Sequence, residues 1–487
     1  MRHNLSLPAT SALFAILGVA VWVRMLSAHG GLWVDEAWSA VLVAKVDTPW
    51  AVFTSINHDN NHHLNSLWMQ AVGYAAPPLA LRALSIVTGA ATVLVVAAIG
   101  ARRSTAHGLV GAALFALSPI LVNYGSEARG YAPMLLCALG AILVAARWLD
   151  APAPAPRHAP GLLALLTILG LLSQLTMLFF VVAIAAWVAL TLRQRVATET
   201  ATGTATGTAA AMTARLMLPS LVAVLLVFTL VFGAAAANPG GMQVGDYVPF
   251  SFARLASALQ VMLATTLGAS ALPRWWITVL ALTLCVAAMA AVAQRRPMAW
   301  LAMLAITGLP IALATLHVAN TGMPRYFLLS SVAVLLVLTD LIATTLTKGP
   351  RSRMLAALAL TFLAIGMSHD IAQDIGRRRG DIDAAIAGVR IEAPGGARVH
   401  VDHLQPVAPL RVAAATARYP LVLTSDCRPA QFVFVDLDDG GAAAATTRRC
   451  GRVYTLRTVR RRGMLSGTDW ALYGLPRARN ALSTNPY

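Results

Sequence analysis

Residue types that could do chemistry are concentrated in residues 31–74. Asp35 and Glu36 stand directly beyond the first long apolar run, and residues 57–65 read Asn-His-Asp-Asn-Asn-His-His-Leu-Asn. Only 12% of the chain is charged, so this density of carboxylate, imidazole and amide groups is unusual for it. We therefore expect the chemistry of the protein in this stretch.

The acidic pair could supply a base. Trp33 and Trp38 flank it, and tryptophan side chains prefer the interface between membrane and water. A carboxylate held there is partly desolvated and can be tuned for proton transfer. The alternative is a pair of solvated interfacial carboxylates without a catalytic role. We favour the base.

The polar stretch also contains the residue types of a divalent metal site. His58 and His62 are one helical turn apart, Asp59 lies between them, and imidazole and carboxylate both suit zinc or manganese. Two other interpretations stay open, namely polar contacts to a sugar or phosphate and capping of an interfacial helix. A divalent metal is thus a candidate cofactor, although the sequence requires none.

Two further motifs pair an arginine with a tyrosine. Ser-Glu-Ala-Arg-Gly-Tyr ends at Tyr131, and Pro-Arg-Tyr ends at Tyr326. Arg129 and Arg325 could each bind a lipid phosphate while the neighbouring tyrosine stacks or donates a hydrogen bond. In the alternative interpretation Glu127 only neutralises its neighbouring arginine, and both pairs are anchors at the membrane interface.

Membrane-spanning helices must position these residues. Of the 487 residues, 58% are hydrophobic, which lies outside the balance of soluble globular proteins. Apolar runs of roughly 20 residues, long enough to cross a bilayer, recur along most of the chain. We predict eleven spans, at residues 9–28, 81–100, 105–123, 131–149, 161–173, 175–193, 216–236, 274–293, 298–316, 325–346 and 352–368.

The first run is too long, and too closely followed by further spans, for a cleaved signal peptide, so we expect a retained helix. The net charge of +17 could suggest nucleic acid as a partner. However, the arginines and lysines form short clusters between apolar runs and in the tail, with no basic face interleaved with aromatic residues. We expect no nucleic acid partner, and membrane topology accounts for much of the charge.

The apolar run of residues 161–193 is too long for one crossing and carries Ser-Gln-Leu-Thr near its middle, so we divide it into two helices. Orientation follows lysine and arginine in short loops, and with this division all the basic loop clusters fall on one side, the cytoplasm. The extracytoplasmic face then receives residues 29–80, 123–131, 237–273 and 317–324 and the tail after residue 369.

Two stretches on the cytoplasmic side are predicted connectors. Residues 150–160 are proline-rich and should be semi-rigid and solvated. Residues 198–213 are a low-complexity run of alanine, threonine and glycine, which we expect neither to pack nor to hold a site.

The tail has the composition of a soluble domain. A helical stretch at residues 381–390 precedes short apolar strands, a pattern that favours a small α/β domain with its own core. Cys427 and Cys450 both fall there, on the oxidising face, which favours a disulfide over free thiols. The strands are expected at residues 397–400, 421–424, 431–436, 452–458 and 470–473.

Taken together, the motifs resemble the membrane glycosyltransferases of the GT-C superfamily, most of all the bacterial branch related to protein O-mannosyltransferases and lipid A aminoarabinose transferases. The resemblance covers residues 9–346 and departs from the commoner His-Pro-Pro-Leu-Tyr-Tyr form at residues 62–67. It implies an α-helical polytopic membrane protein of GT-C type. Residues 1–368 would form the catalytic domain with the active site in residues 29–80, and residues 369–487 the extracytoplasmic α/β domain.

This resemblance implies transfer of a sugar, with inversion, from a polyprenyl-phosphate donor to an acceptor on the outer face of the cytoplasmic (inner) membrane. A lipid phosphate leaves as a stabilised anion, so the reaction needs one base and positive charge at the leaving group. The base would be Asp35. The residues facing the donor phosphate would be Arg129, Arg325, Tyr131 and Tyr326. The residues lining the substrate site would be Glu36, Glu127, Asn61, His62, His63 and Asn65.

Two other classes of protein compete with this interpretation. A transporter or flippase of lipid-linked intermediates would show internal repeats and ionisable groups near the bilayer midplane, whereas only Asp340 lies well inside a predicted span. A non-catalytic scaffold of envelope assembly would use the tail as its working part. The expected partners are therefore the lipid-linked donor, a glycan, lipid or protein acceptor, and membrane lipids.

Overall fold

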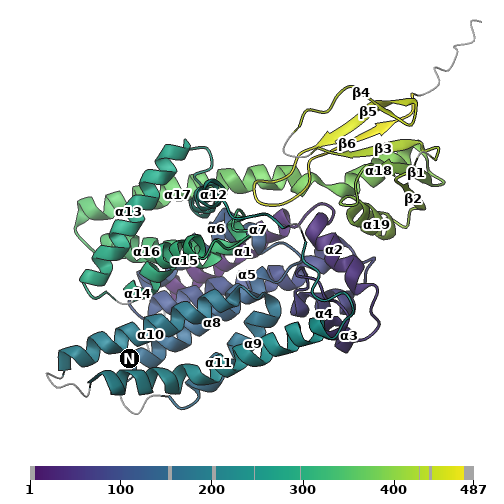
Figure 1. The fold of residues 1–487 in the computed structure, drawn as a ribbon. Coiled ribbons are helices and arrows are strands. Elements are labelled where there is room, and N and C mark those ends of the chain that lie inside the picture. Colours follow the sequence, from purple (N-terminus) through teal and green to yellow (C-terminus); the bar gives the residue numbers. More distant parts are fainter. Residues whose placement is uncertain are drawn as a thin grey trace, which may run out of the picture.

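The computed structural model describes residues 6–151, 156–199, 205–245, 247–296, 298–426, 428–437 and 441–476. A bundle of long helices makes up most of the chain, and a smaller domain with a β-sheet stands at one end of the bundle (Figure 1). Eight described helices are long and apolar enough to cross a membrane. They are α1 Leu7–Ser27, α5 Pro78–Ala101, α8 Tyr131–Asp150, α10 Met177–Glu199, α11 Ala205–Ala236, α13 Arg274–Ala293, α16 Leu328–Leu346 and α17 Pro350–Arg377.

The other three predicted spans are also helical, but they are short or interrupted. The third breaks into α6 Thr105–Leu117 and α7 Pro119–Tyr124, because Ser118 is extended and Pro119 starts a new helix. The fifth is α9 Ala159–Ser173. The ninth consists of α14 Ala299–Met303, a π-helical turn at Leu304–Gly308 and α15 Leu309–Thr315.

The division of residues 161–193 is confirmed. Helix α9 ends at Ser173, Gln174 is extended with φ −161° and ψ 129°, and α10 begins at Met177. The connector prediction for residues 198–213 is wrong over its second half, because α11 begins at Ala205 and already buries Ala209 against the bundle. Alanine is the best helix former, and this outweighed the low complexity. Residues 200–204, and residues 152–155 of the other connector, lie outside the described residues.

Several helices were not predicted from the sequence. The longest of them is α12 Phe252–Leu267, in a stretch interpreted as a loop. Its last turn is fixed to two neighbours, since Ser118 donates to the Thr266 carbonyl at 2.9 Å and the Thr266 hydroxyl donates to Ser331 at 3.0 Å. These contacts tie α12 to α7 and α16. At the same end of the bundle lie α2 Val34–Val43, α3 Pro49–Thr54, α4 His63–Val72 and the 3₁₀ turn Pro324–Phe327.

The C-terminal domain is a six-stranded mixed sheet with two helices. The strand order is β2-β1-β3-β6-β5-β4, with β1 parallel to β2 and β3 and the remaining neighbours antiparallel. The five predicted strands are confirmed, and β4 is an additional edge strand that exposes two of its four residues. The strands are β1 Ala397–Val401, β2 Leu421–Thr424, β3 Phe432–Asp436, β4 Thr446–Arg449, β5 Arg452–Arg460 and β6 Trp470–Gly474.

Helices α18 Ile382–Glu392 and α19 Val407–Thr416 bury their apolar faces against this sheet. The second helix also contacts α2, and Val412 shares a core cluster with Leu32 and Ala37. The C-terminal domain therefore packs directly on the helices that follow the first span, where the candidate chemistry of the sequence is concentrated.

Candidate functional site

Asp35 lies between two arginines from distant parts of the chain. Its Oδ2 forms an ion pair with Nη1 of Arg129 and a second one, at 3.0 Å, with Nη1 of Arg325. The Asp35 side chain is 25% exposed, so it is open to a ligand, whereas that of Arg129 is only 4% exposed. Residues 35, 129 and 325, proposed from the sequence as base and phosphate ligands, thus meet at one place.

Every nitrogen of the Arg129 guanidinium has a partner. Besides Nη1 to Asp35, Nη2 donates to Oδ1 of Asn60 at 2.6 Å and Nε donates to Nε2 of His62 at 3.2 Å. Burial, together with the positive charges of Arg129 and Arg325, holds the pKa of His62 well below its usual value. The imidazole is therefore neutral and can accept the hydrogen bond, which fixes Arg129 in one orientation.

Aromatic rings lie beside both arginines. The Arg129 guanidinium carbon is 5.1 Å from the ring centre of Tyr131, and that of Arg325 is 5.8 Å from Tyr326. Trp33 lies on the Arg129 side as well, at 5.8 Å. Such cation–π contacts stabilise a guanidinium without using its N–H donors.

Glu36, predicted to line the substrate site, has a structural position instead. Its side chain is fully buried and pairs with the equally buried Arg82, through bonds of 2.8 and 2.5 Å. It also accepts from the backbone N–H of Ala128 at 2.6 Å and of Trp33 at 3.2 Å. Although burial raises its pKa, the charge and hydrogen bonds of Arg82 outweigh this and hold the pKa below the usual value. The prediction for Glu36 is therefore wrong, because no surface remains for a substrate.

Arg82 holds the start of α2 in place. Its Nη1 donates to the carbonyls of Ala28 and Gly30, both at 2.7 Å, and its Nη2 donates to Gly31 at 3.0 Å. Glu36 pairs with this guanidinium and also accepts from the backbone of Ala128. The Arg82–Glu36 ion pair therefore joins the end of α1, the start of α2, helix α5 and the loop that carries Arg129.

That loop, residues 125–130, runs through a space without room for side chains at its two glycines. A Cβ on Gly125 would lie 2.7 Å from Nε of Arg24. A Cβ on Gly130 would overlap the Ser173 carbonyl and lie 3.1 Å from the Cβ of His62. Gly130 therefore lets α8 start, and Arg129 lie, directly against the end of α9.

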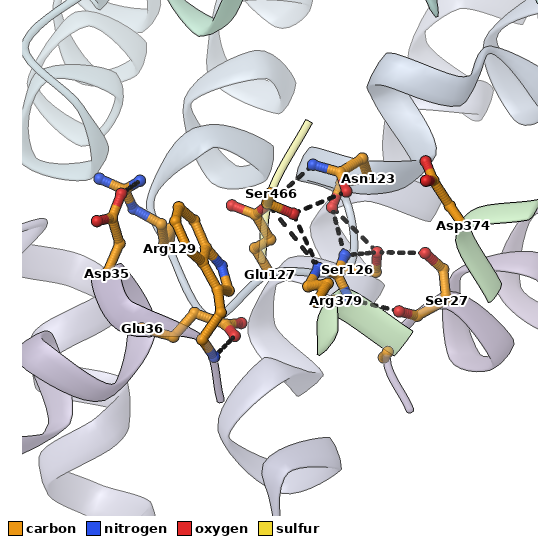
Figure 2. Close-up of polar contacts among 12 residues, drawn as sticks. Ser27, Asp35, Glu36, Asn123, Ser126, Glu127, Arg129, Asp374, Arg379 and Ser466 are labelled. Atoms are coloured by element: carbon orange, nitrogen blue, oxygen red, sulfur yellow. Dashed lines mark hydrogen bonds and ion pairs between the residues drawn. The ribbon is translucent and has the colours of Figure 1, made fainter. Parts of the chain in front are cut away.

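Glu127 belongs to a buried network that reaches the C-terminal domain (Figure 2). Its Oε1 accepts from Asn123 at 2.8 Å and lies 3.9 Å from Nε of Arg379. Burial raises its pKa above the usual value, and its Oε2 has no hydrogen-bond partner among the described residues. Glu127 is fully buried, so the structure places it behind the Asp35 site, at the side of Arg129 away from Asp35.

Arg379 is the centre of this network. It donates to Ser466 at 3.2 Å, to Ser126 at 2.8 Å, to the Asn123 carbonyl at 3.1 Å and to the Ser27 carbonyl. One side chain at the junction of α17 and the C-terminal domain therefore contacts the end of α1, the end of α7, the Arg129 loop and the segment before β6.

The predicted polar ligands of residues 57–65 are mostly engaged within the protein. Asn61 donates to the carbonyls of Val52 and Ile56, at 2.8 and 3.0 Å, and His63 stacks on Phe53 with ring centres 5.0 Å apart. Asn65 donates to the Ala128 carbonyl at 2.7 Å. These side chains hold their own segment together, and of the predicted polar ligands in this stretch only His62 has a hydrogen bond to Arg129.

The candidate metal ligands do not converge. His58 pairs with Asp59 at 2.8 Å, whereas Nε2 of His62 accepts from Arg129. Among the residues that the structure describes, no group of three or more histidine, cysteine or acidic side chains has the arrangement of a metal site. These residues do not fit a metal, and no chemical step below depends on one.

The cysteine predictions fall partly outside the described residues. Cys450 is disulfide-bonded, and Cys427 is not among the described residues. Cys137 and Cys285, which lie in α8 and α13, are free.

Three important residues were missed in the sequence, namely Arg82, Asn60 and Arg379. Arg82 is the only charged residue of α5, and a charge so close to a membrane needs a partner, which is a signal that could have found it. Asn60 lies inside the polar stretch, and it connects Arg129 with the Asp35 carbonyl at 2.8 Å. Arg379 follows Arg377 and Arg378, and nothing in the sequence distinguishes it from these two arginines.

Comparison with known proteins supports the fold through one solved structure. No protein-family model and no curated protein matches the chain. ArnT from Cupriavidus metallidurans, solved bound to undecaprenyl phosphate, matches with a TM-score of 0.52 at 12% identity, over 95% of this chain and 98% of ArnT. The archaeal oligosaccharyltransferase AglB from Archaeoglobus fulgidus, solved with an inhibitory peptide and a dolichol-phosphate, matches with a TM-score of 0.48 at 11% identity, over 89% of this chain and 70% of AglB. The likeness to ArnT shows that this chain has the polytopic GT-C fold.

Proposed function

We propose that this chain, which has the GT-C fold, is an inverting glycosyltransferase. It moves a sugar from a polyprenyl-phosphate donor to an acceptor hydroxyl on the extracytoplasmic face of the cytoplasmic membrane. The observation that supports this most is the partly exposed carboxylate of Asp35, held between Arg129 and Arg325 at the membrane-proximal end of the helices. One base and two cations are the groups that this reaction needs.

The two arginines suit a lipid phosphate. Guanidinium groups bind phosphate oxygens through two parallel hydrogen bonds, and both arginines start or precede a spanning helix, where a lipid head group lies. ArnT was solved with undecaprenyl phosphate and AglB with dolichol-phosphate, both lipid phosphates. We therefore assign the donor phosphate to Arg129 and Arg325, beside Tyr131 and Tyr326.

Both guanidinium groups donate to the same oxygen of the Asp35 carboxylate. A donor phosphate competes for the same N–H groups. As it binds, it draws N–H donors away from Asp35, which leaves the carboxylate free to accept the hydrogen of the acceptor hydroxyl. The arrangement thus couples activation of the base to binding of the donor.

The reaction then proceeds in one displacement. Asp35 takes the proton of the acceptor hydroxyl, whose oxygen forms the new bond to the anomeric carbon. The bond from that carbon to the phosphate oxygen breaks, and its electron pair leaves with the polyprenyl phosphate. Arg129 and Arg325 stabilise the charge of this leaving group, and the attack from the opposite side inverts the anomeric centre.

The neighbouring carboxylates cannot replace Asp35 in this role. Glu36 and Glu127 are both fully buried, Glu36 is committed to Arg82, and Glu127 faces Arg379. A base must reach the proton that it removes, and of these three carboxylates only Asp35 is exposed to do so.

The test is a transfer assay with a panel of radiolabelled polyprenyl-phosphate sugars and native membranes as the source of acceptors. We expect label to move from one donor into a new product with the wild type, and transfer to fall at least about 100-fold in Asp35→Asn. Asp47→Asn, an exposed carboxylate in the loop after α2, is the matched control and should transfer normally. Normal transfer by well-folded Asp35→Asn would overturn the role of Asp35, and consumption of no donor would overturn the proposed function.

A further inference from the structure

A second candidate site lies at the opposite end of the helix bundle from Asp35. A cavity of about 470 Å³ is enclosed by α5, α13, α14 and α16. Helix α5 begins beside the Asp35 site, with Arg82, and reaches the cavity in its last turns, at Val96 and Ile99. The volume is within the roughly 300–1,000 Å³ that small-ligand pockets occupy. The two sites are thus separated by the length of a spanning helix.

Charged side chains line one part of the cavity. Asp340, the carboxylate inside the predicted tenth span, pairs with Arg103 and, at 3.2 Å, with Arg296, and lies 3.6 Å from Nε2 of His107. Arg102, which also lines the cavity, pairs with Asp150. The three arginines of the cavity, Arg102, Arg103 and Arg296, carry one charge more than its two aspartates, and Asp340 faces two of the arginines. The site therefore has the charge to accept one further anion.

The remaining wall is apolar and built from small side chains. Ala287, Ala290 and Ala291 of α13 face Ala302 of α14 and Val337 of α16 across the cavity. Alanine side chains leave space between the helices that larger residues would fill. An occupant of this part must be apolar, and it must be narrow enough to lie between helices.

Helix α13 separates this space from the membrane lipid. It exposes large apolar side chains along its length, which marks it as a helix at the lipid boundary. Those side chains are Trp275, Trp276, Val279, Leu282, Val286 and Met289. Figure 1 shows α13 tilted at the edge of the bundle. The cavity thus lies one helix away from lipid, and the Arg103 and Arg296 side chains are 41% and 37% exposed at its mouth.

We propose that this cavity binds an anionic glycerophospholipid from the leaflet opposite to the Asp35 site. Its phosphate is held by Arg103 and Arg296, which then share their N–H groups between Asp340 and the lipid, and one acyl chain lies along the alanines of α13. The combination of an excess cation, an apolar channel and a boundary helix fits an amphiphile with one negative charge. This proposal does not depend on the glycosyl transfer.

Binding is tested with the full chain in nanodiscs of phosphatidylcholine, titrated with a fluorescent phosphatidylglycerol and, separately, with a fluorescent phosphatidylcholine. We expect saturable binding of phosphatidylglycerol at least about tenfold tighter than of phosphatidylcholine. The double variant Arg103→Ala/Arg296→Ala should remove this preference. Arg295→Ala/Arg353→Ala changes two exposed arginines outside the cavity and should retain it.

The variant Ala290→Trp fills the apolar part without changing charge, and it should also abolish saturable binding. It serves as the deciding variant if the double arginine variant does not fold. Equal binding of the two lipids, or an unchanged preference in either cavity variant, would overturn the proposal. So would displacement of the probe by undecaprenyl phosphate but not by unlabelled phosphatidylglycerol, since this would assign the cavity to the carrier lipid. Inorganic phosphate alone should not compete, because the acyl chain supplies part of the affinity.

Discussion

At the scale of single residues, Asp35 and Glu36 are neighbours with different tasks. Glu36 is fully buried, and its pKa is held below the usual value by Arg82 despite the opposing effect of burial. Asp35 is partly exposed and pairs with two arginines that a phosphate can recruit. The first carboxylate therefore has a structural position, whereas the second is the one that a substrate could reach.

This contrast predicts different effects on stability. Glu36→Gln leaves the buried charge of Arg82 without its counter-ion and should lower the free energy of unfolding by about 3–5 kcal/mol. Asp35→Asn removes a partly exposed group and should cost much less. Thermal unfolding of both variants in detergent measures the difference.

The double variant Glu36→Gln/Arg82→Met is the control, because it removes both charges and should recover part of the lost stability. If Glu36→Gln unfolded at the wild-type temperature, the structural role of the pair would be refuted.

The two buried histidines predict a loss of stability in acid. Burial lowers the pKa of His63 to about 4 and that of His62 well below its usual value, so the folded protein excludes protons that the unfolded chain binds below a pH of about 6.5. Stability is therefore full above that pH and falls as the pH drops towards 4. His63 contributes up to about 3 kcal/mol to this change.

His63→Phe keeps a ring stacked on Phe53 but cannot titrate. We expect its unfolding temperature to decline less between pH 7 and pH 4.5 than that of the wild type, measured in the same detergent. Parallel declines would contradict the assignment of this acid sensitivity to His63.

The sequence placed Asp35, Arg129 and Arg325 correctly in one site, but it did not show that Glu36, expected to line the same site, is buried against Arg82. Successive residues of a helix point roughly 100° apart, so neighbours in the sequence can face a cleft and a core. Which of them faces the core depends on Arg82, which lies in a different helix and is embedded in an apolar run.

At the scale of elements, the loop of residues 125–130 is what positions Arg129. The Glu36 carboxylate holds it from one side through Ala128, and Arg379 holds it from the other through Ser126. Gly130 lets it approach α9 without a steric overlap.

Gly130→Ala should therefore displace Arg129. An added Cβ overlaps the Ser173 carbonyl, so we expect the free energy of unfolding to fall by about 1–3 kcal/mol and transfer activity to fall up to about 100-fold. Gly18→Ala in α1 is the control, because a Cβ there meets nothing within 4 Å. Wild-type activity in Gly130→Ala would show that the close approach is not needed.

Most elements followed from hydrophobic pattern and length, including the turn between α9 and α10. Helix α12 did not, because Arg254, Gln260 and several hydroxyl side chains lower its hydropathy and its 16 residues are too few for a span. Hydrogen bonds to α7 and α16 hold it in place, and such contacts between distant segments cannot be read from a local pattern.

At the scale of the whole molecule, the C-terminal domain is connected to the Asp35 site through Arg379. This side chain bridges α17, the end of α1, the Arg129 loop and Ser466 of the C-terminal domain (Figure 2). Its partners in the helix bundle are more than 250 residues away in the sequence, which is why the tail could be predicted as an α/β domain but not as a support of the site.

Arg379→Ala should reduce both stability and transfer. It removes the positive charge next to the buried Glu127 and the side-chain donor of the Ser27 carbonyl, so we expect a loss of about 3 kcal/mol or more. Limited proteolysis between the bundle and the C-terminal domain should also become faster.

Arg378→Ala is the matched control. Arg378 precedes Arg379, also has a positive φ, and its side chain is 56% exposed; its one ion pair among the described residues is to Asp381. It should behave like the wild type. Equal effects of the two substitutions would mean that the buried network around Arg379 does not connect the C-terminal domain with the Asp35 site.

The most direct test of the central claim is the affinity of the polyprenyl-phosphate donor for Asp35→Asn. If Arg129 and Arg325 bind the donor phosphate and Asp35 is their competitor and the base, the variant should bind donor at least as tightly as the wild type while its transfer is lost. Weaker donor binding by a well-folded variant, or transfer that persists, would contradict the assignment of Asp35 as a base that donor binding frees from the two arginines.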